Sequence, residues 1–196
     1  FDADKDWYHG TADDIEEFLK SKRGSGTQAN SAKKAFWFTD DAETTARSYA
    51  DHSGTTNKVA ALVKEADVAE RAGNWNLYDK KLQEAEELES FFMGANENRL
   101  QGQNIIPTKL PKDEGLLTVD MKGESFEDGA FGGVNAALDK AKAAGYKGVK
   151  FQNLDDAVGF SNKPATHVAI FEPQNIRSKF AKFDPANSQS SNLLAS

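Results

Sequence analysis

The sequence predicts an α+β fold, and three of its features lead to this prediction. Short runs rich in aromatic and β-branched residues, each long enough for one strand, occur towards both ends of the 196-residue chain. Segments with apolar residues at helical spacing lie between these runs. A long, highly charged segment separates the first strands from the later ones. We therefore predict one domain, residues 1–186, with residues 60–92 as an inserted helical hairpin and residues 187–196 as a flexible tail.

The first predicted strand ends at residues 7–9, and a helix is expected to follow it. Thr11 is a favourable N-cap residue. Asp13 and Asp14 would then lie in the first turn, where the helix dipole favours acidic groups. The apolar residues at helical spacing are Ile15, Phe18 and Leu19. Residues 21–31, rich in Gly, Ser and Lys, predict a loop.

A second strand, residues 35–38, leads into a second helix. Asp40 and Glu43 form a start that resembles a capping box. Tyr49 shares one face of this helix with Ala42, Ala46 and Ala50, so we expect its side chain to pack inward over the sheet. The aromatic residues of the strand are expected in the core. Within residues 60–92, Gly73-Asn74 interrupts the charged pattern, which predicts two helices joined by a turn.

Strands and one helix are expected in the second half of the chain. The expected strands are residues 104–108, 116–119, 148–151 and 168–171. Residues 134–144 predict a helix, because its apolar side chains share one face and Gly145 is a suitable C-cap.

The composition excludes several kinds of protein. There is no cysteine, so disulfides and thiolate metal ligands are excluded. The net charge of −7 opposes a broad nucleic-acid-binding surface, and no apolar run approaches the length of a membrane span. The chain begins with Phe1 and shows no signal peptide, which we interpret as a domain taken from a longer protein.

His9 and Tyr49 are the first candidates for a functional site. The chain has only three histidines, and His9 lies between an aromatic residue and Gly10 at the end of a strand. A glycine at this point would let a ligand approach the backbone, because it has no Cβ. Taken alone, each residue also has an ordinary interpretation: histidines often cap or pack, and an aromatic residue on a helix face is usually part of the core.

These segments, in this order, resemble ADP-ribosyltransferase domains of the diphtheria-toxin and poly-ADP-ribose polymerase superfamily. The resemblance is greatest to those embedded in large phage and mobile-element polyproteins. It rests on Tyr8-His9-Gly10-Thr11, Phe36-Trp37-Phe38-Thr39-Asp40-Asp41, Ser48-Tyr49-Ala50, residues 145–153 and the ending that starts at Thr166. It covers most of the chain outside residues 58–100.

The resemblance implies a split, strongly bent β-sandwich with peripheral helices and a cleft that binds NAD. His9 would bond to a ribose hydroxyl, the backbone of Gly10 would hold the nicotinamide carboxamide, and Tyr49 would stack on the nicotinamide ring. The further residues expected in the cleft are Thr11, Phe38, Thr39 and His167. No metal is expected.

The chain departs from the family pattern at the third catalytic position. Familiar members carry a glutamate at the start of the last strand, where this chain has His167 preceded by Thr166. The nearest carboxylates are Asp156 and Asp155, in the loop before that strand, and we expect Asp156 to act as the third catalytic residue. Cleavage of NAD develops positive charge on the ribose, so a negative neighbour is favourable. A tyrosine face also suits the cationic nicotinamide ring.

The resemblance implies a mono-ADP-ribosyltransferase that uses NAD as substrate, because polymer elongation in this superfamily depends on the glutamate. We expect a phage-encoded effector that modifies a host macromolecule, most simply a protein, in the cytoplasm of the host cell. The virion could carry it as part of a polyprotein. Two alternatives stay open: an NAD glycohydrolase, and a degenerate module that binds NAD or a partner without catalysis.

Overall fold

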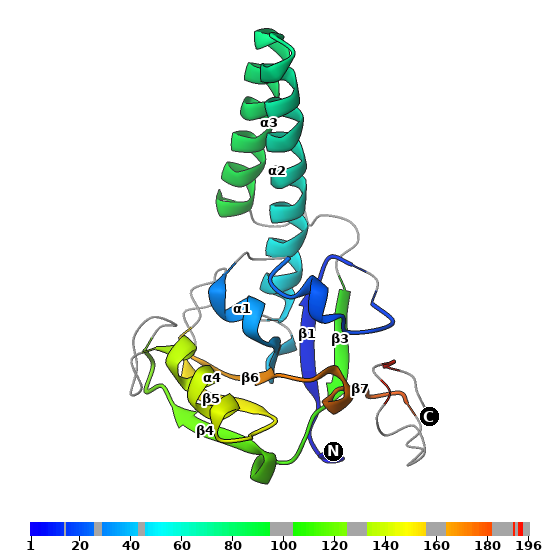
Figure 1. Ribbon diagram of the computed structural model, residues 1–196, viewed down its shortest axis with the longest axis vertical. Coiled ribbons are helices and arrows are strands. Elements are labelled where there is room, and N and C mark those ends of the chain that lie inside the picture. Colours follow the sequence, from blue (N-terminus) through cyan, green and yellow to red (C-terminus); the bar gives the residue numbers. More distant parts are fainter. Residues whose placement is uncertain are drawn as a thin grey trace.

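The computed structural model describes residues 1–13, 15–25, 29–42, 46–94, 104–124, 133–155, 164–181, 190 and 192–193, without the side chains of residues 47–48, 51–57 and 89–94. Its strands are β1 Trp7–Thr11, β2 Phe36–Thr39, β3 Asn104–Lys109, β4 Leu116–Asp120, β5 Gly148–Leu154, β6 Ala165–Ile170 and β7 Arg177–Ser178. Its helices are α1 Asn30–Lys34, α2 Arg47–Arg71, α3 Trp75–Gly94 and α4 Val134–Ala143, with short 3-10 turns at Lys20–Lys22, Asp113–Gly115 and Pro173–Asn175. The predicted α+β class is confirmed (Figure 1).

The strands form one sheet in the order β4-β5-β6-β2-β1-β3-β7. Alternate residues along β2 face two different cores, as expected for a strand covered on both sides. Phe36 and Phe38 belong to one core together with Trp7 and Phe18. Ala35 and Trp37 contact the other core, which α4 covers. The central strands are therefore fixed from both faces, and this holds the ends of β1 and β2 in place.

The sheet splits between β1 and β2. These strands are antiparallel, and within the described residues they pair only at Tyr8 and Thr39. By contrast, β1 pairs with β3 along its whole length, from Trp7 to Thr11. Beyond the single contact, β1 and β2 diverge and leave room between them.

The helix predicted after Thr11 is wrong. Thr11 is the last residue of β1, where it pairs with Asn104 of β3. Its hydroxyl accepts a hydrogen bond from the N–H of Asp13 at 3.0 Å, so it holds a turn and does not cap a helix. Of the residues that follow, those that the structure describes form no helix before Lys20–Lys22. Phe18 is buried, which explains why the apolar residues of this segment suggested a helix face.

The C-terminal segment is held to the sheet at one point. Most of the tail predicted to be flexible, residues 187–196, lies outside the described residues. Leu193, however, is buried in the core that contains Phe18. Its N–H donates to the carbonyl of Glu16, and its own carbonyl accepts from the N–H of Ser178. Leu193 is therefore held to the segment after β1 and to β7.

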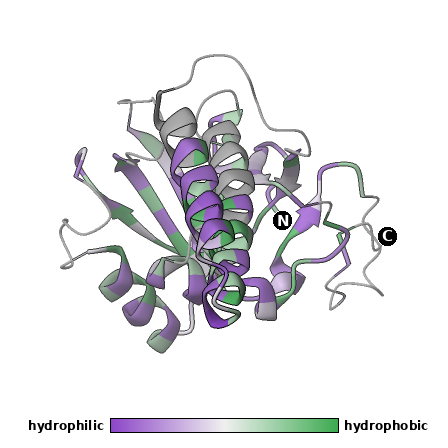
Figure 2. Ribbon diagram, turned by 90° about the horizontal axis from the view of Figure 1, so that it is seen from above, coloured by the Kyte–Doolittle hydropathy of each residue, from purple (hydrophilic) through white to green (hydrophobic). Residues whose placement is uncertain are grey.

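The helix that carries Tyr49 and the first helix of the charged segment are one 25-residue helix, α2. The turn at Gly73, which has a φ of +71°, returns the chain into α3. The two helices pack together through the small buried side chains Ala66, Ala69 and Ala85. Together they project from the sheet (Figure 1), and many of their residues are hydrophilic (Figure 2). Within the described residues, no helix is long and apolar enough to cross a membrane.

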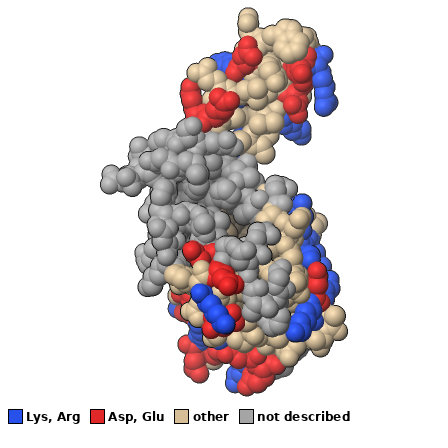
Figure 3. All heavy atoms as spheres, turned by 90° about the vertical axis from the view of Figure 1, so that its left-hand side faces the viewer, with Lys and Arg blue, Asp and Glu red and all other residues tan. Residues whose placement is uncertain are grey.

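We propose that residues 60–92 are an insertion that the fold of residues 1–186 does not need. Acidic and basic side chains are interspersed on the visible face of the hairpin (Figure 3), and its packing is mainly internal. Lys81 of α3 forms an ion pair with Glu65 of α2 at 3.0 Å, which joins the two helices within the hairpin.

Replacing residues 60–92 by a short Gly-Ser bridge should therefore leave a domain that unfolds cooperatively. Residues 59 and 93 lie on neighbouring, antiparallel helices, so a short bridge can join them. Urea unfolding monitored by circular dichroism measures this. A broad, non-cooperative transition would show that the hairpin is part of the folding unit.

Candidate active site

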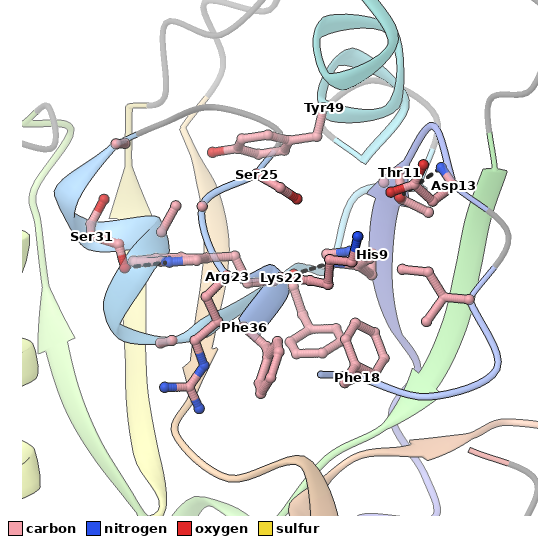
Figure 4. A pocket seen from close by; sticks show the side chains of 18 of the residues that line it. His9, Thr11, Asp13, Phe18, Lys22, Arg23, Ser25, Ser31, Phe36 and Tyr49 are labelled. Atoms are coloured by element: carbon pink, nitrogen blue, oxygen red, sulfur yellow. Dashed lines mark hydrogen bonds between the residues drawn. The ribbon is translucent and has the colours of Figure 1, made fainter. Parts of the chain in front are cut away.

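A cavity of about 930 Å³ lies where β1 and β2 diverge (Figure 4). Its walls come from β1, the segment that follows β1, α1 and β2. Single residues of α2, α4 and β6 complete the lining. The cavity exists because β1 pairs with β3 on one side and β2 pairs with β6 on the other, while β1 and β2 share only one paired position.

His9 is fixed across the gap between the two strands. Its Nδ1 lies 2.7 Å from the carbonyl oxygen of Trp37. A carbonyl only accepts, so Nδ1 carries the hydrogen and donates it, and Nε2 is left as an acceptor. Burial lowers the pKa of His9 below its ordinary value, although the bond to Trp37 opposes this effect. The imidazole is therefore neutral near pH 7, with an acceptor nitrogen on a cavity wall.

Two phenylalanines hold the imidazole ring in this orientation. Phe18 packs edge-on against the ring of His9 with the centroids 5.0 Å apart. Phe38 lies 5.5 Å away at a tilted angle. Both side chains are buried, so the ring has little freedom to turn.

The structure gives Gly10 a different role from the one that its sequence position suggests. A Cβ at Gly10 would lie 1.8 Å from the carbonyl oxygen of Ala46 and 2.8 Å from the nitrogen of Ala50. The space that the glycine frees is therefore filled by the beginning of α2, and not by the cavity. Its backbone still lines the cavity, but the glycine is required because α2 packs directly on β1.

Tyr49, Trp37 and His167 are three of the aromatic rings that line the cavity. Tyr49, which reaches in from α2 (Figure 4), makes an edge contact with His167 of β6, with the centroids 6.4 Å apart. His167 is 1% exposed and pairs with Thr39. Trp37 stacks on Phe151 at 5.6 Å, and its Nε1 donates to the carbonyl of Ser31.

Trp37 was expected in the core, but it is only half-buried and lines the cavity. Trp37 packs against the core that α4 covers, on the opposite side of β2 from the core that contains Phe36 and Phe38. Trp37 is one of the lining aromatic residues that were not among the predicted cleft residues; Tyr8, Phe18 and Phe36 are the others.

The expected cleft residues of the described chain come together in this cavity. They are His9, Gly10, Thr11, Phe38, Thr39, Tyr49 and His167. Asp156 lies outside the described residues. Asp155 is described, is not among the residues that line the cavity, and donates its N–H to the carbonyl of Glu124 at 3.1 Å.

Sequence patterns did not indicate the charged side chains of the cavity wall. Its carboxylates are Asp13, Glu16 and Glu17, and its cations are Lys22 and Arg23, within the described residues. All five belong to residues 13–23, where a helix and a loop were expected. A helix would have pointed these side chains in several directions, whereas the observed path brings them to one cavity.

Arg23 holds this segment against the sheet. Its guanidinium donates to the carbonyl oxygens of Lys34 and Phe171, at the end of α1 and just after β6, and stacks over Phe36 at 4.4 Å. Burial lowers the pKa of Arg23, while the nearby charge of Glu172 opposes this shift. Nearby, Lys20 forms an ion pair with Glu172 at 2.6 Å, which ties the same segment to the turn after β6.

Metal ligands are not grouped in the described part of the chain: no three or more His, Asp or Glu side chains there are placed to hold an ion.

Comparison with known proteins agrees with this geometry. Residues 4–183 match the family described as ADP-ribosyltransferase in polyvalent proteins. No curated protein and no solved structure matches the chain significantly. The match spans nearly the whole sheet and every described residue of the cavity, and the mixed architecture agrees with the α+β fold of such enzymes. The chain belongs to the ADP-ribosyltransferase family found in polyvalent proteins.

Proposed function

We propose that this domain cleaves NAD and transfers a single ADP-ribose unit to a macromolecule of a host cell. The observation that carries the proposal is the cavity in which His9, Tyr49 and His167 meet, although they come from three elements far apart in the sequence. Membership of the family supports ADP-ribosyl transfer. Action as a phage-encoded effector on a host protein, in the host cytoplasm and after carriage in a virion, is part of the same proposal.

The nicotinamide ring of NAD suits the aromatic part of the cavity. Tyr49 and Trp37 offer ring faces to a flat cation, which is attracted by stacking and by the cation–π interaction. In this arrangement the backbone of Gly10 holds the carboxamide. A ribose hydroxyl then lies near His9 and donates a hydrogen bond to its Nε2.

The pyrophosphate of NAD requires cations or N–H donors. Lys22 and Arg23 supply them on the wall formed by the segment after β1. The Nε of Arg23 is buried and makes no hydrogen bond with the described residues, so it is a donor still to be paired. Both residues would stabilise the bound nucleotide without taking part in bond cleavage.

In the reaction, the bond between ribose C1′ and the nicotinamide nitrogen breaks, and its electron pair leaves with neutral nicotinamide. An acceptor oxygen or nitrogen then forms a bond to C1′ and loses its proton to water. The ribose passes through a state with positive charge, as in glycoside hydrolysis. We assign the stabilising carboxylate to Asp156, ahead of Asp155, with His167 shaping the cleft.

Incubation with labelled NAD and a bacterial host lysate tests this function. Label should appear on a macromolecule with the wild type, and His9→Ala should lower NAD cleavage by about a hundredfold or more, because a positioned group of the reacting centre is lost. Tyr49→Ala should lower it as well. Tyr78→Ala is the matched control, because Tyr78 lies on α3 and away from the cavity. This variant should cleave NAD at the wild-type rate.

The two alternative functions give different results in the same assay. Free ADP-ribose without labelled macromolecule would identify an NAD glycohydrolase. Absence of turnover in the wild type, with NAD binding that depends on His9, would identify a degenerate binding module. Thermal unfolding of each variant separates loss of function from loss of fold.

A further inference from the structure

Asp40 follows β2 directly and extends its pairing with β6 through a side chain. The N–H of Asp40 donates to the carbonyl of Thr166 at 3.2 Å, as in a regular antiparallel pair. The N–H of Thr166, however, donates to a carboxylate oxygen of Asp40 at 3.1 Å. In a regular pair the main-chain carbonyl of residue 40 would be this acceptor. The side chain of Asp40 therefore replaces its own main chain at the end of the ladder.

This arrangement allows the main chain to leave the sheet directly after Thr39, the last residue of β2 that pairs with β6. The hydroxyl of Thr39 accepts a hydrogen bond from the N–H of Asp41 at 3.2 Å. The carbonyl of Asp41 in turn accepts from the N–H of Ala46 at 2.9 Å, next to the start of α2. Asp40 is therefore attached both to the start of β6 and to the turn that leads to α2.

The two elements that Asp40 connects each supply one ring to the cavity. His167 comes from β6, directly after Thr166, and Tyr49 comes from the first turn of α2. The two rings are in edge contact, with their centroids 6.4 Å apart. A displacement of Thr166 would therefore move the ring against which Tyr49 packs. Asp40 itself is not among the residues that line the cavity.

The position of the carboxylate oxygen matters more here than the charge of Asp40. The other carboxylate oxygen lies 3.4 Å from Nζ of Lys5, and the side chains of Lys5 and Asp40 are 39% and 32% exposed. Ion pairs between groups as exposed as these contribute little to stability. The bond from Thr166, by contrast, fixes the main chain of β6 one residue before His167. A neutral side chain with an oxygen at the same place should serve β6 equally well.

We propose that Asp40 is a positioning residue of the active site, whose side-chain oxygen holds Thr166 and so places His167 against Tyr49. The proposal rests on the proposed function, because it takes Tyr49 as the residue that stacks on nicotinamide. Asp40 touches neither the substrate nor the reacting atoms. It acts through the two rings, which must be aligned before a flat cation can stack between the walls of the cavity.

Four variants of the full chain separate position from charge in assays of NAD cleavage. Asp40→Ala removes the acceptor and should raise the KM for NAD by about tenfold or more, with a smaller change in kcat, because misplaced binding groups lower affinity. Asp40→Asn keeps a side-chain oxygen, and Lys5→Met removes only the ion pair, so both should stay within about twofold of the wild-type KM. Asn74→Ala is the matched control, because it also removes a side-chain oxygen that accepts a main-chain N–H, that of Leu77 at 3.2 Å in the hairpin. Its KM should equal that of the wild type.

NMR spectroscopy of the same variants gives a measurement that does not depend on NAD. The amide hydrogen of Thr166 should exchange slowly with solvent in the wild type and in Asp40→Asn, and faster in Asp40→Ala. Among the four variants, only Asp40→Ala should shift the side-chain signals of His167 and Tyr49.

The inference fails if Asp40→Ala leaves these side-chain signals unchanged. It fails equally if Asp40→Asn or Lys5→Met raises the KM as much as Asp40→Ala does, because charge would then be the property that the site requires. If the wild type neither binds nor cleaves NAD, the proposed function fails, and the signals of His167 and Tyr49 still decide whether Asp40 places the two rings. If the wild type cleaves NAD while Asp40→Ala keeps the wild-type KM, only the inference fails.

Discussion

Gly10→Ala should displace the beginning of α2 and abolish NAD cleavage, although the added methyl group touches no part of the cavity. The new Cβ would lie 1.8 Å from the carbonyl oxygen of Ala46 and 2.8 Å from the nitrogen of Ala50. Both are backbone atoms, so no side-chain rotation relieves the clash. Tyr49 lies between these two contacts in the sequence, so a shift of α2 moves the ring that we assign to nicotinamide. Overpacking of this kind costs about 1–3 kcal/mol.

Gly115→Ala is the matched control for this prediction. A Cβ at Gly115 would approach no atom closer than 3.3 Å, and that atom belongs to the flexible side chain of Lys147. Urea unfolding should show a lower free energy of unfolding for Gly10→Ala than for Gly115→Ala, and only Gly10→Ala should lose NAD cleavage. Full activity and unchanged stability of Gly10→Ala would contradict the packing that the structure shows.

The strands and α4 could be predicted from sequence because their burial follows a simple period. Phe36 and Phe38 alternate with Trp37, as a strand between two cores requires. In α4, buried positions Ala137, Leu138 and Ala141 recur at helical spacing. In both cases the local pattern and the tertiary environment agree, so the pattern is a reliable guide.

The segment after β1 could not be predicted, because its structure depends on partners far along the chain. Thr11 is bound by Asn104, and Glu16 by Leu193, and these contacts replace the hydrogen bonds of a helix. The spacing of Ile15, Phe18 and Leu19 fits a helix face equally well, but Leu19 is 44% exposed. The charged side chains that this segment brings to the cavity could not be predicted for the same reason.

The cavity itself depends on sheet register, which sequence patterns do not fix. The pairing of Thr39 with His167 brings the last long strand beside β2 across more than one hundred residues. The family resemblance, which rests on the order of the motifs, indicated which residues would meet in the cavity. It did not reveal that the aromatic side chain of Trp37 lines the same cavity, or that Gly10 serves the packing of α2.

The start of β6 is tied to the end of β2 by a pair of bonds. The N–H of Thr166 donates to a carboxylate oxygen of Asp40 at 3.1 Å, and the N–H of Asp40 donates to the carbonyl of Thr166 at 3.2 Å. Asp40 also approaches Lys5 at 3.4 Å. Its carboxylate is therefore already engaged in holding β6, and Asp40 is not among the residues that line the cavity. We therefore do not assign Asp40 as the carboxylate beside the ribose.

Asp156→Asn should reduce the rate of NAD cleavage by about a hundredfold or more while NAD binding changes little, since loss of one electrostatic stabiliser usually has this size. The oxocarbenium-like state gains from a negative neighbour and gains nothing from an imidazolium. His167, which is 1% exposed and contacts Tyr49 at its edge, shapes the aromatic part of the cavity, so His167→Ala should mainly weaken NAD binding. Single-turnover rates and dissociation constants for Asp156→Asn, Asp155→Asn and His167→Ala separate the two effects. Full turnover in both aspartate variants, together with loss of turnover in His167→Ala, would place His167 in the third catalytic position.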